Sequence, residues 1–97
     1  MSTDPAPRPV APRMLVKAPA GRALLFEYRA GEGLPPHTHA GQAVVVAVLR
    51  GRLRLSVDGQ EREVPAGEVL HVQTTGLFSS RALEDGTRVL VTLLDLG

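Results

Sequence analysis

The sequence contains no cysteine, only three aromatic residues in 97 positions, and no apolar run long enough to span a bilayer. Without cysteine there is neither a disulfide framework nor a thiolate metal site, so any metal would need histidine, carboxylate, amide or water ligands. The longest apolar run, "AVVVAVL", falls far short of the roughly 20 residues of a membrane-spanning helix. The N-terminus also lacks the apolar core of a signal peptide. We therefore expect a cytoplasmic protein with no membrane partner.

A strong charge of either sign is also missing. Eleven Lys and Arg face ten Asp and Glu, which gives a net charge of +1. The basic residues are scattered among acidic ones, and few aromatic side chains are present to stack on bases. Nucleic acid is therefore not an expected partner.

Proline is concentrated at one end of the chain. Four of the eight prolines lie in the first twelve residues, where they favour extended, solvated backbone. We expect residues 1–12 to form a flexible arm and residues 13–97 to form a single domain.

Short runs rich in Val and Leu follow the arm and alternate with turns that contain Gly, Asp or Pro. This pattern predicts an all-β fold, an antiparallel double-sheet sandwich or barrel, with no helix of ten residues. An Asp58-Gly59 pair predicts a tight hairpin. The expected strands cover residues 13–19, 22–30, 42–50, 52–57, 61–64, 68–73, 77–83 and 87–96.

The run "AVVVAVL", residues 43–49, does not alternate between apolar and polar residues. A strand of this kind has both faces buried, whereas "RLRLSV", residues 52–57, alternates and has one solvent-exposed face. One face of residues 43–49 can line the interior of the barrel. The other face must meet a second layer, and in so small a chain a second subunit is expected, which predicts a homodimer.

His37 and His39 stand two residues apart in "GLPPHTHAG". In an extended segment their side chains point to the same side, as in half of a site for zinc, iron, nickel or manganese. An isolated pair is a weak signal, and the alternative is two polar residues at the mouth of a pocket without a metal. His71, the third histidine, shares a strand face with Val69 and Gln73, and the sequence leaves open whether that face is inside.

The stretch "GEGLPPHTHAGQAVVVAVLRG", residues 31–51, resembles the first motif of the cupin superfamily: Gly31, His37, His39 and Gly51 stand at or near the expected places. Residues 48–72 are similar to the hairpin between the two cupin motifs, and Gly67 opens the second. The resemblance implies a small jelly-roll barrel with a metal or ligand pocket inside one end, usually in a homodimer.

This chain departs from the cupin pattern at the ligand positions. Ala43 stands where the acidic ligand of the first motif is expected, and Phe78 stands where the second motif has its histidine. Gly51 comes one residue later than is usual, which would fit a bulge near Gly41 that turns Gln42 inward. The candidate metal ligands are therefore His37, His39, Gln42 and His71.

Three further residues, Tyr28, Ala43 and Phe78, are candidates for the wall of the pocket, although Phe78 and Tyr28 would also serve as core packing. The sequence predicts a small-molecule-binding protein with a degenerate metal site. Two alternatives stay open. One is a metal-dependent oxygenase, isomerase or lyase that uses His37 and His39 as ligands to one divalent transition metal. The other is a structural or sensory module that acts through its dimer surface.

Overall fold

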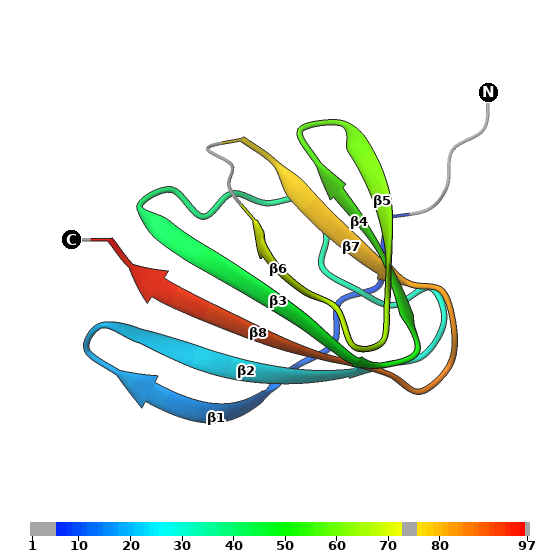
Figure 1. The fold of residues 1–97 in the computed structure, drawn as a ribbon, viewed down its shortest axis with the longest axis horizontal. Helices are drawn as coiled ribbons and strands as arrows, with labels where there is room; N and C mark the ends of the chain where they lie inside the picture. The colour runs from blue at the N-terminus through cyan, green and yellow to red at the C-terminus, as the bar shows by residue number, and fades with distance from the viewer. Residues whose placement is uncertain (1–5, 73–75, 97) are drawn as a thin grey trace.

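The computed structural model describes residues 6–72 and 76–96 of the chain, which contain eight β-strands (Figure 1). The strands are β1 (Arg13–Ala18), β2 (Gly21–Tyr28), β3 (Gln42–Arg50), β4 (Arg52–Val57), β5 (Gln60–Pro65), β6 (Val69–Val72), β7 (Phe78–Ala82) and β8 (Thr87–Asp95). All eight expected strands are present, and their ends lie within two residues of the expected ones, apart from Gln73, which falls outside the described residues. No helix in the described ranges is long and apolar enough to cross a membrane. The cytoplasmic location stays a prediction.

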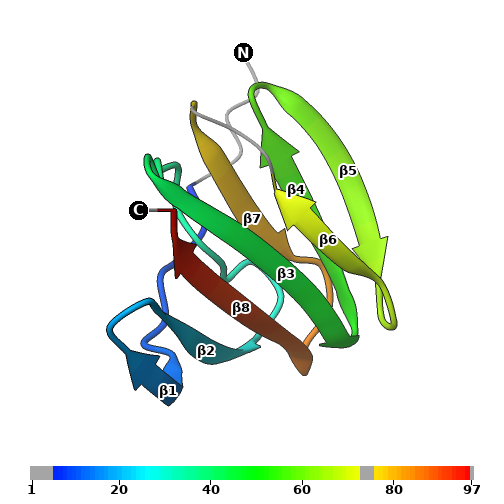
Figure 2. The same cartoon turned by 60° about the vertical axis from the view of Figure 1, so that its left-hand side comes forward.

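The strands form two antiparallel sheets, in the orders β1-β2-β8-β3-β6 and β5-β4-β7. Figures 1 and 2 show the two sheets facing each other as two layers, with a turn that leads from β5 of one sheet to β6 of the other. The predicted all-β double-sheet fold is confirmed.

The core lies between the two layers because side chains on each strand alternate between inside and outside. Val44, Val46 and Val48 of β3 are buried, and so are Leu53 and Leu55 of β4. The other buried apolar residues are Phe26, Tyr28, Val64, Val72, Phe78, Ala82, Val89, Val91 and Leu93. This alternation fixes which residues of each strand can reach the interior.

Asp58 and Gly59 form the hairpin between β4 and β5, as predicted. Their φ angles are +50° and +82°, which is the combination that a two-residue hairpin needs to match the twist of its strands. This turn sets the register in which Val57 faces Gln60.

The register irregularity in β3 lies at its end rather than at its start. The pairing with β8 shifts between Val48 and Arg50, which makes Leu49 the extra residue. The bulge expected near Gly41 is therefore wrong. Gln42 instead pairs regularly with Asp95 and lies on the same face of β3 as the buried Val44 because both are even positions of an uninterrupted strand.

The outer face of the five-stranded sheet is apolar but not covered by the chain itself. Ala43, Val45 and Ala47 of β3 are only half-buried on this face, beside Leu90 and Thr92 of β8. The absence of alternation in residues 43–49 predicted that both faces of this strand are buried. Within one chain, only the inner face of β3 is fully buried.

The segment of residues 31–37 runs along β7 and carries the first histidine to its place. Backbone N–H groups of Ser80 and Ala82 donate to the carbonyls of Leu34 (3.0 Å) and Glu32 (2.8 Å). Gly33 is buried here, and a Cβ atom on it would lie 2.0 Å from the Ser80 carbonyl oxygen. Only glycine therefore permits this approach.

The described part of the proline-rich arm contacts the same segment. The Arg8 N–H donates to the Gly31 carbonyl (3.2 Å), and the Gly33 N–H donates to the Arg8 carbonyl (3.0 Å). The arm thus adds a short parallel bridge beside residues 31–33.

Candidate functional site

His37 and His39 lie together at the end of β7. His37 forms an isolated antiparallel bridge with Phe78, in which each backbone N–H donates to the other residue's carbonyl (3.0 and 2.9 Å). The two imidazole centroids are 4.6 Å apart, with the rings nearly perpendicular. The two histidines are therefore close together, as expected. The backbone hydrogen bonds with Phe78 hold His37 in place.

The tautomer of His37 follows from the hydrogen bond that its Nδ1 makes. Its Nδ1 lies 2.6 Å from the carbonyl oxygen of Pro35. A carbonyl oxygen can only accept, so Nδ1 carries the proton and donates it. In the neutral ring, Nε2 is then left with a lone pair that can accept a hydrogen bond.

The protonation of His39 is set through two further residues. The side-chain amide nitrogen of Gln42 lies 2.9 Å from Oδ1 of Asp95, and because a carboxylate only accepts, the NH₂ end of Gln42 faces Asp95. Oε1 of Gln42 then faces Nδ1 of His39 at 2.9 Å, so this nitrogen must donate. His39 is thereby placed in the same tautomer as His37, with Nε2 as the acceptor.

The environment of His39 keeps it neutral. Burial is the main cause that lowers the pKa of this imidazole, and the electrostatic interactions with His37 and Arg22 act in the same direction. The hydrogen bond with Gln42 raises the pKa and opposes these effects only in part. At neutral pH, Nε2 of His39 is therefore an unprotonated acceptor.

Phe78 packs against both imidazoles. Its ring centroid lies 4.3 Å from that of His37 and 5.4 Å from that of His39, and its side chain is buried. The residue at the expected position of the third cupin histidine is therefore next to the other two. As a phenyl ring it supplies packing and no metal-binding atom.

Three of the residues named from the sequence are not brought to this cluster. Ala43 and His71 alternate with the buried Val44 and Val72, so both lie on the outer side of the five-stranded sheet. His71 is exposed there. Tyr28 is buried beside Phe26 at the other end of β2, seven residues from Gly21, or roughly 23 Å along the strand.

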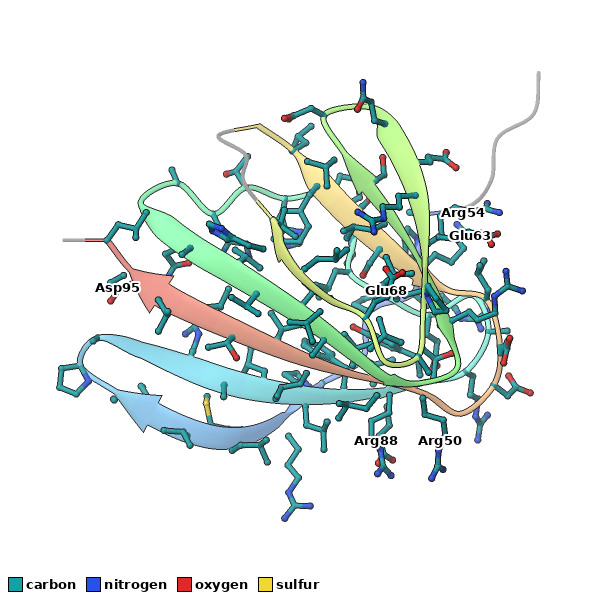
Figure 3. All side chains as sticks on the ribbon, in the orientation of Figure 1. Arg50, Arg54, Glu63, Glu68, Arg88 and Asp95 are labelled. Atoms are coloured by element: carbon teal, nitrogen blue, oxygen red, sulfur yellow. The ribbon has the colours of Figure 1, made fainter. Side chains whose placement is uncertain are left out.

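Sequence reasoning missed Asp95 and Arg22. Asp95 ends β8, more than fifty residues from His39 along the chain, and only the pairing of β3 with β8 brings it opposite Gln42. Figure 3 shows Asp95 at the end of the molecule where β8 terminates. Arg22 pairs with Leu93 on the neighbouring strand. No local motif marks either residue, and a correct strand order would have been needed to find them.

The donor set does not fit a resident metal ion. Within the described ranges, no group of three or more His, Cys, Asp or Glu side chains could hold one. The amide oxygen of Gln42 accepts the hydrogen bond from His39. Asp95 contacts the amide nitrogen of Gln42 and is therefore separated from His39 by that side chain. Two imidazoles remain, whereas a catalytic zinc site has about three protein ligands.

A cavity of about 750 Å³ opens between the edge strands β5 and β6. Apolar residues of both sheets line it, namely Leu55, Val57, Leu70 and Val72, and its rim carries Asp58, Gln60, Glu61, Arg62 and His71. Val57 is the register partner of Phe78, so the cavity adjoins the strand position that packs on the histidine pair. Its volume is within the range of about 300 to 1,000 Å³ that is usual for small-molecule sites.

The family model for the cupin domain matches residues 24–92, more than two thirds of the chain. The chain belongs to the cupin family. No curated protein is significantly similar to it in sequence.

Solved cupin structures share the fold. A cupin protein from Bacteroides fragilis is 22% identical, with a TM-score of 0.78, and the match covers 100% of this chain and 85% of that one. An RmlC-like cupin from Desulfovibrio desulfuricans is 27% identical, with a TM-score of 0.76 and coverages of 87% and 80%. The cupin domain of Cnp3 from Schizosaccharomyces pombe is 19% identical with a TM-score of 0.79. That match covers 87% of this chain but only 63% of the Cnp3 structure.

Proposed function

We propose that this cupin binds a small organic molecule that donates hydrogen bonds to the Nε2 atoms of His37 and His39, and that it does so without a resident metal. One observation carries the proposal: both Nδ1 atoms are committed as donors, to the Pro35 carbonyl and to Gln42, which leaves two neighbouring imidazole acceptors. A ligand with adjacent O–H or N–H groups complements such a pair. The cavity beside Val57 offers room for an apolar part of the same molecule.

The tautomers supply a direct test. In ¹⁵N-labelled protein, long-range ¹H–¹⁵N correlations should show the proton on Nδ1 of both histidines. Asp95→Asn removes the carboxylate that orients Gln42, so His39 should lose its single tautomer. His37, held by a backbone carbonyl, should not change. Protonation of Nε2 in the parent protein would contradict the proposal.

Binding is tested with a fragment panel, one half carrying neutral O–H and N–H donors and the other half carboxylates. Donor fragments should shift the ring resonances of His37 and His39, and His39→Ala should abolish the response. Glu84→Ala, on an exposed turn, is a control that should not matter. Hits confined to the carboxylate half would overturn the assignment.

Metal content decides between this proposal and a metal-dependent enzyme. Protein purified without a His-tag or chelator should contain far less than one zinc, iron, nickel or manganese per chain, also after incubation with these ions. A value near one that is lost in both His37→Ala and His39→Ala would replace the binding proposal with the metal-dependent one.

We also propose that the protein is a homodimer that pairs through the outer face of the five-stranded sheet. All five strands contribute apolar side chains to this face, namely Val16, Ala23, Leu25, Val45, Ala47, Val69, Leu90 and Leu94. Val16, Val69 and Leu94 are 58%, 65% and 45% exposed. An apolar patch of this extent favours a partner, and a second copy presents the same apolar surface.

A further inference from the structure

A second polar site lies at the end of the five-stranded sheet where the turn between β1 and β2 meets the end of β8 and the start of β3 (Figure 1). A groove of about 310 Å³ opens there. Four polar side chains line it, namely those of Lys17, Arg22, Gln42 and Asp95. Its volume is at the lower end of the range of about 300 to 1,000 Å³ that is usual for small-molecule sites, so the groove suits a small ligand.

Backbone contacts hold the strand ends of the groove in place. The Asp95 N–H donates to the Ala20 carbonyl (2.8 Å), and Asp95 pairs with Gln42 across β8 and β3. A Cβ atom on Gly21 would lie 2.2 Å from the Leu93 carbonyl oxygen, so β2 and β8 approach this closely only because glycine occupies the position. The side chains that line the groove are thus carried by a fixed backbone.

Lys17 and Arg22 are direct neighbours on the inner side of this sheet. They are register partners in the pairing of β1 with β2. Arg22 lies on the same face of β2 as the buried Phe26 and Tyr28 because these positions differ by even numbers. At this end of the sheet both Lys17 and Arg22 are exposed. Two cationic side chains therefore stand side by side at the groove, and like charges at opposed positions destabilise a sheet.

The positive charge of this pair is only partly compensated. Among the described residues, Asp95 is the only acidic one that lines the groove, and its Oδ1 accepts a hydrogen bond from the amide nitrogen of Gln42 (2.9 Å). The ion pairs within residues 6–72 and 76–96 include neither Lys17 nor Arg22. Two cations and one carboxylate leave one positive charge in excess. A ligand with one negative charge would therefore make the groove neutral.

The donors in the groove match a carboxylate. The guanidinium of Arg22 presents two parallel N–H groups that fit both oxygens of a carboxylate, and the ammonium of Lys17 adds a second cationic donor. A doubly charged phosphate would instead exceed the positive charge that is available once Asp95 is counted. Ala18 and Pro19 present only apolar side-chain atoms to the groove, and a short carbon chain can lie against them. We propose that the groove at Lys17 and Arg22 binds the carboxylate group of a small organic acid.

This site does not depend on the function proposed for the histidine pair. The groove binds through positive charge, whereas the histidines offer hydrogen-bond acceptors, and Gln42 is the side chain that the two sites have in common. His37 makes its hydrogen bonds and ring contacts with Pro35, His39 and Phe78, none of which lines the groove. His37→Ala removes one acceptor of the pair and should leave carboxylate binding in the groove unchanged.

The test is a titration of the ¹³C- and ¹⁵N-labelled full chain with sodium butyrate, sodium phosphate and 1-butanol at constant pH and ionic strength. Lys17 is the only lysine of the sequence, so its side-chain signals report on the groove without overlap from another lysine. Butyrate should shift these signals and the amide signals of residues 17–22 in a saturable manner. Phosphate should bind more weakly. Butanol, which has the same carbon chain but no charge, should cause no saturable shift.

Variants separate the groove from ordinary surface charge. Lys17→Gln and Arg22→Gln, made separately, should each weaken butyrate binding about fivefold, which is the scale of one exposed ion pair. Asp95→Asn should strengthen the binding because a competing carboxylate is removed. Arg50→Gln is the matched control and should have little effect. Arg50 is exposed like Arg22, but it lies at the other end of β3, far from Asp95 (Figure 3).

Four outcomes would overturn the proposal. They are the absence of saturation with butyrate in the parent, binding of phosphate as tight as that of butyrate, saturable shifts with butanol, and a loss in Arg50→Gln as large as that in Arg22→Gln. Because the side chains of Lys17 and Arg22 are exposed, both variants should keep the circular dichroism spectrum of the parent. If one of them fails to fold, the other gives the same decision.

Discussion

Gly33→Ala is the sharpest test of how the first histidine is held. Gly33 lies in the segment that runs along β7, and an alanine Cβ would stand 2.0 Å from the Ser80 carbonyl oxygen, with ordinary contact beginning at 3.4 Å. The two backbones would have to separate by more than an ångström. The affected atoms are main-chain atoms of a sheet, so no side-chain rotation can relieve the clash.

The cost follows from the hydrogen bonds that this separation breaks. Those from Ser80 to Leu34 (3.0 Å) and from Ala82 to Glu32 (2.8 Å) would lengthen beyond the range of a hydrogen bond. At about 1 kcal/mol of net free energy each, with a further penalty where a buried group is left unpaired, we expect a loss of roughly 2–4 kcal/mol in the free energy of unfolding. The bridge between His37 and Phe78 is continuous with this ladder and should loosen as well.

Urea unfolding followed by circular dichroism measures this loss. Gly59→Ala is the matched control because Gly59 has a φ of +82° but no atom within 4 Å of the added Cβ. It should cost about 1 kcal/mol, the strain of the left-handed conformation alone. If Gly33→Ala costs no more than this control, the close approach of residues 31–37 to β7 is not what holds His37, and the reasoning fails.

Three further predictions concern the pH, the metal and the dimer. Burial lowers the pKa of His39 below its ordinary value of about 6.5, so the contribution of His39 to stability is complete above pH 6.5 and falls as the pH drops below that value. Urea unfolding between pH 7.5 and 5 should show this fall in the free energy of unfolding. His39→Gln should remove the part of the pH dependence that His39 causes. Phe78→His places a third imidazole beside the other two and should tighten zinc binding at least tenfold in a competition titration, with Phe26→His, a buried phenylalanine that makes no such contact, as the control. Val45→Glu puts a charge in the middle of the apolar outer face and should convert a dimer into monomers in light scattering, whereas Leu77→Glu, an exposed leucine outside that face, should not.

The fold was predictable because its signal is distributed over many residues. Alternation in residues 52–57, the Asp58-Gly59 turn and the regular spacing of Val- and Leu-rich runs each indicate the same architecture, and an error in one would not change it. The bulge in β3 was misplaced because the spacing between His39 and Gly51 shows that one residue is extra but does not show where it lies. The extra residue instead falls at Leu49, where the pairing with β8 determines it.

The candidate site was only partly predictable because it depends on which strands pair. The histidines could be placed together from their spacing, and the neighbouring ring of Phe78 from the second motif. Ala43 and His71 point outward because the neighbouring Val44 and Val72 point inward. A shift of one residue in the register of either strand would have turned its candidate residue inward. Asp95 enters the site only through its place opposite Gln42.

The position of Asp95 also gives a physical reason why a carboxylate is absent from the start of β3. Gln42 occupies the inward position there, next to His39, and its amide bridges from that ring to Asp95 with two hydrogen bonds of 2.9 Å. A glutamate at position 42 would set two carboxylates against each other and lose the donor that Asp95 now receives. The two residues therefore constrain one another: while β8 ends in an aspartate, a neutral amide is the better neighbour for His39. The negative charge then stands behind the imidazole, where it orients the ring, rather than in front of it, where it would bind a metal.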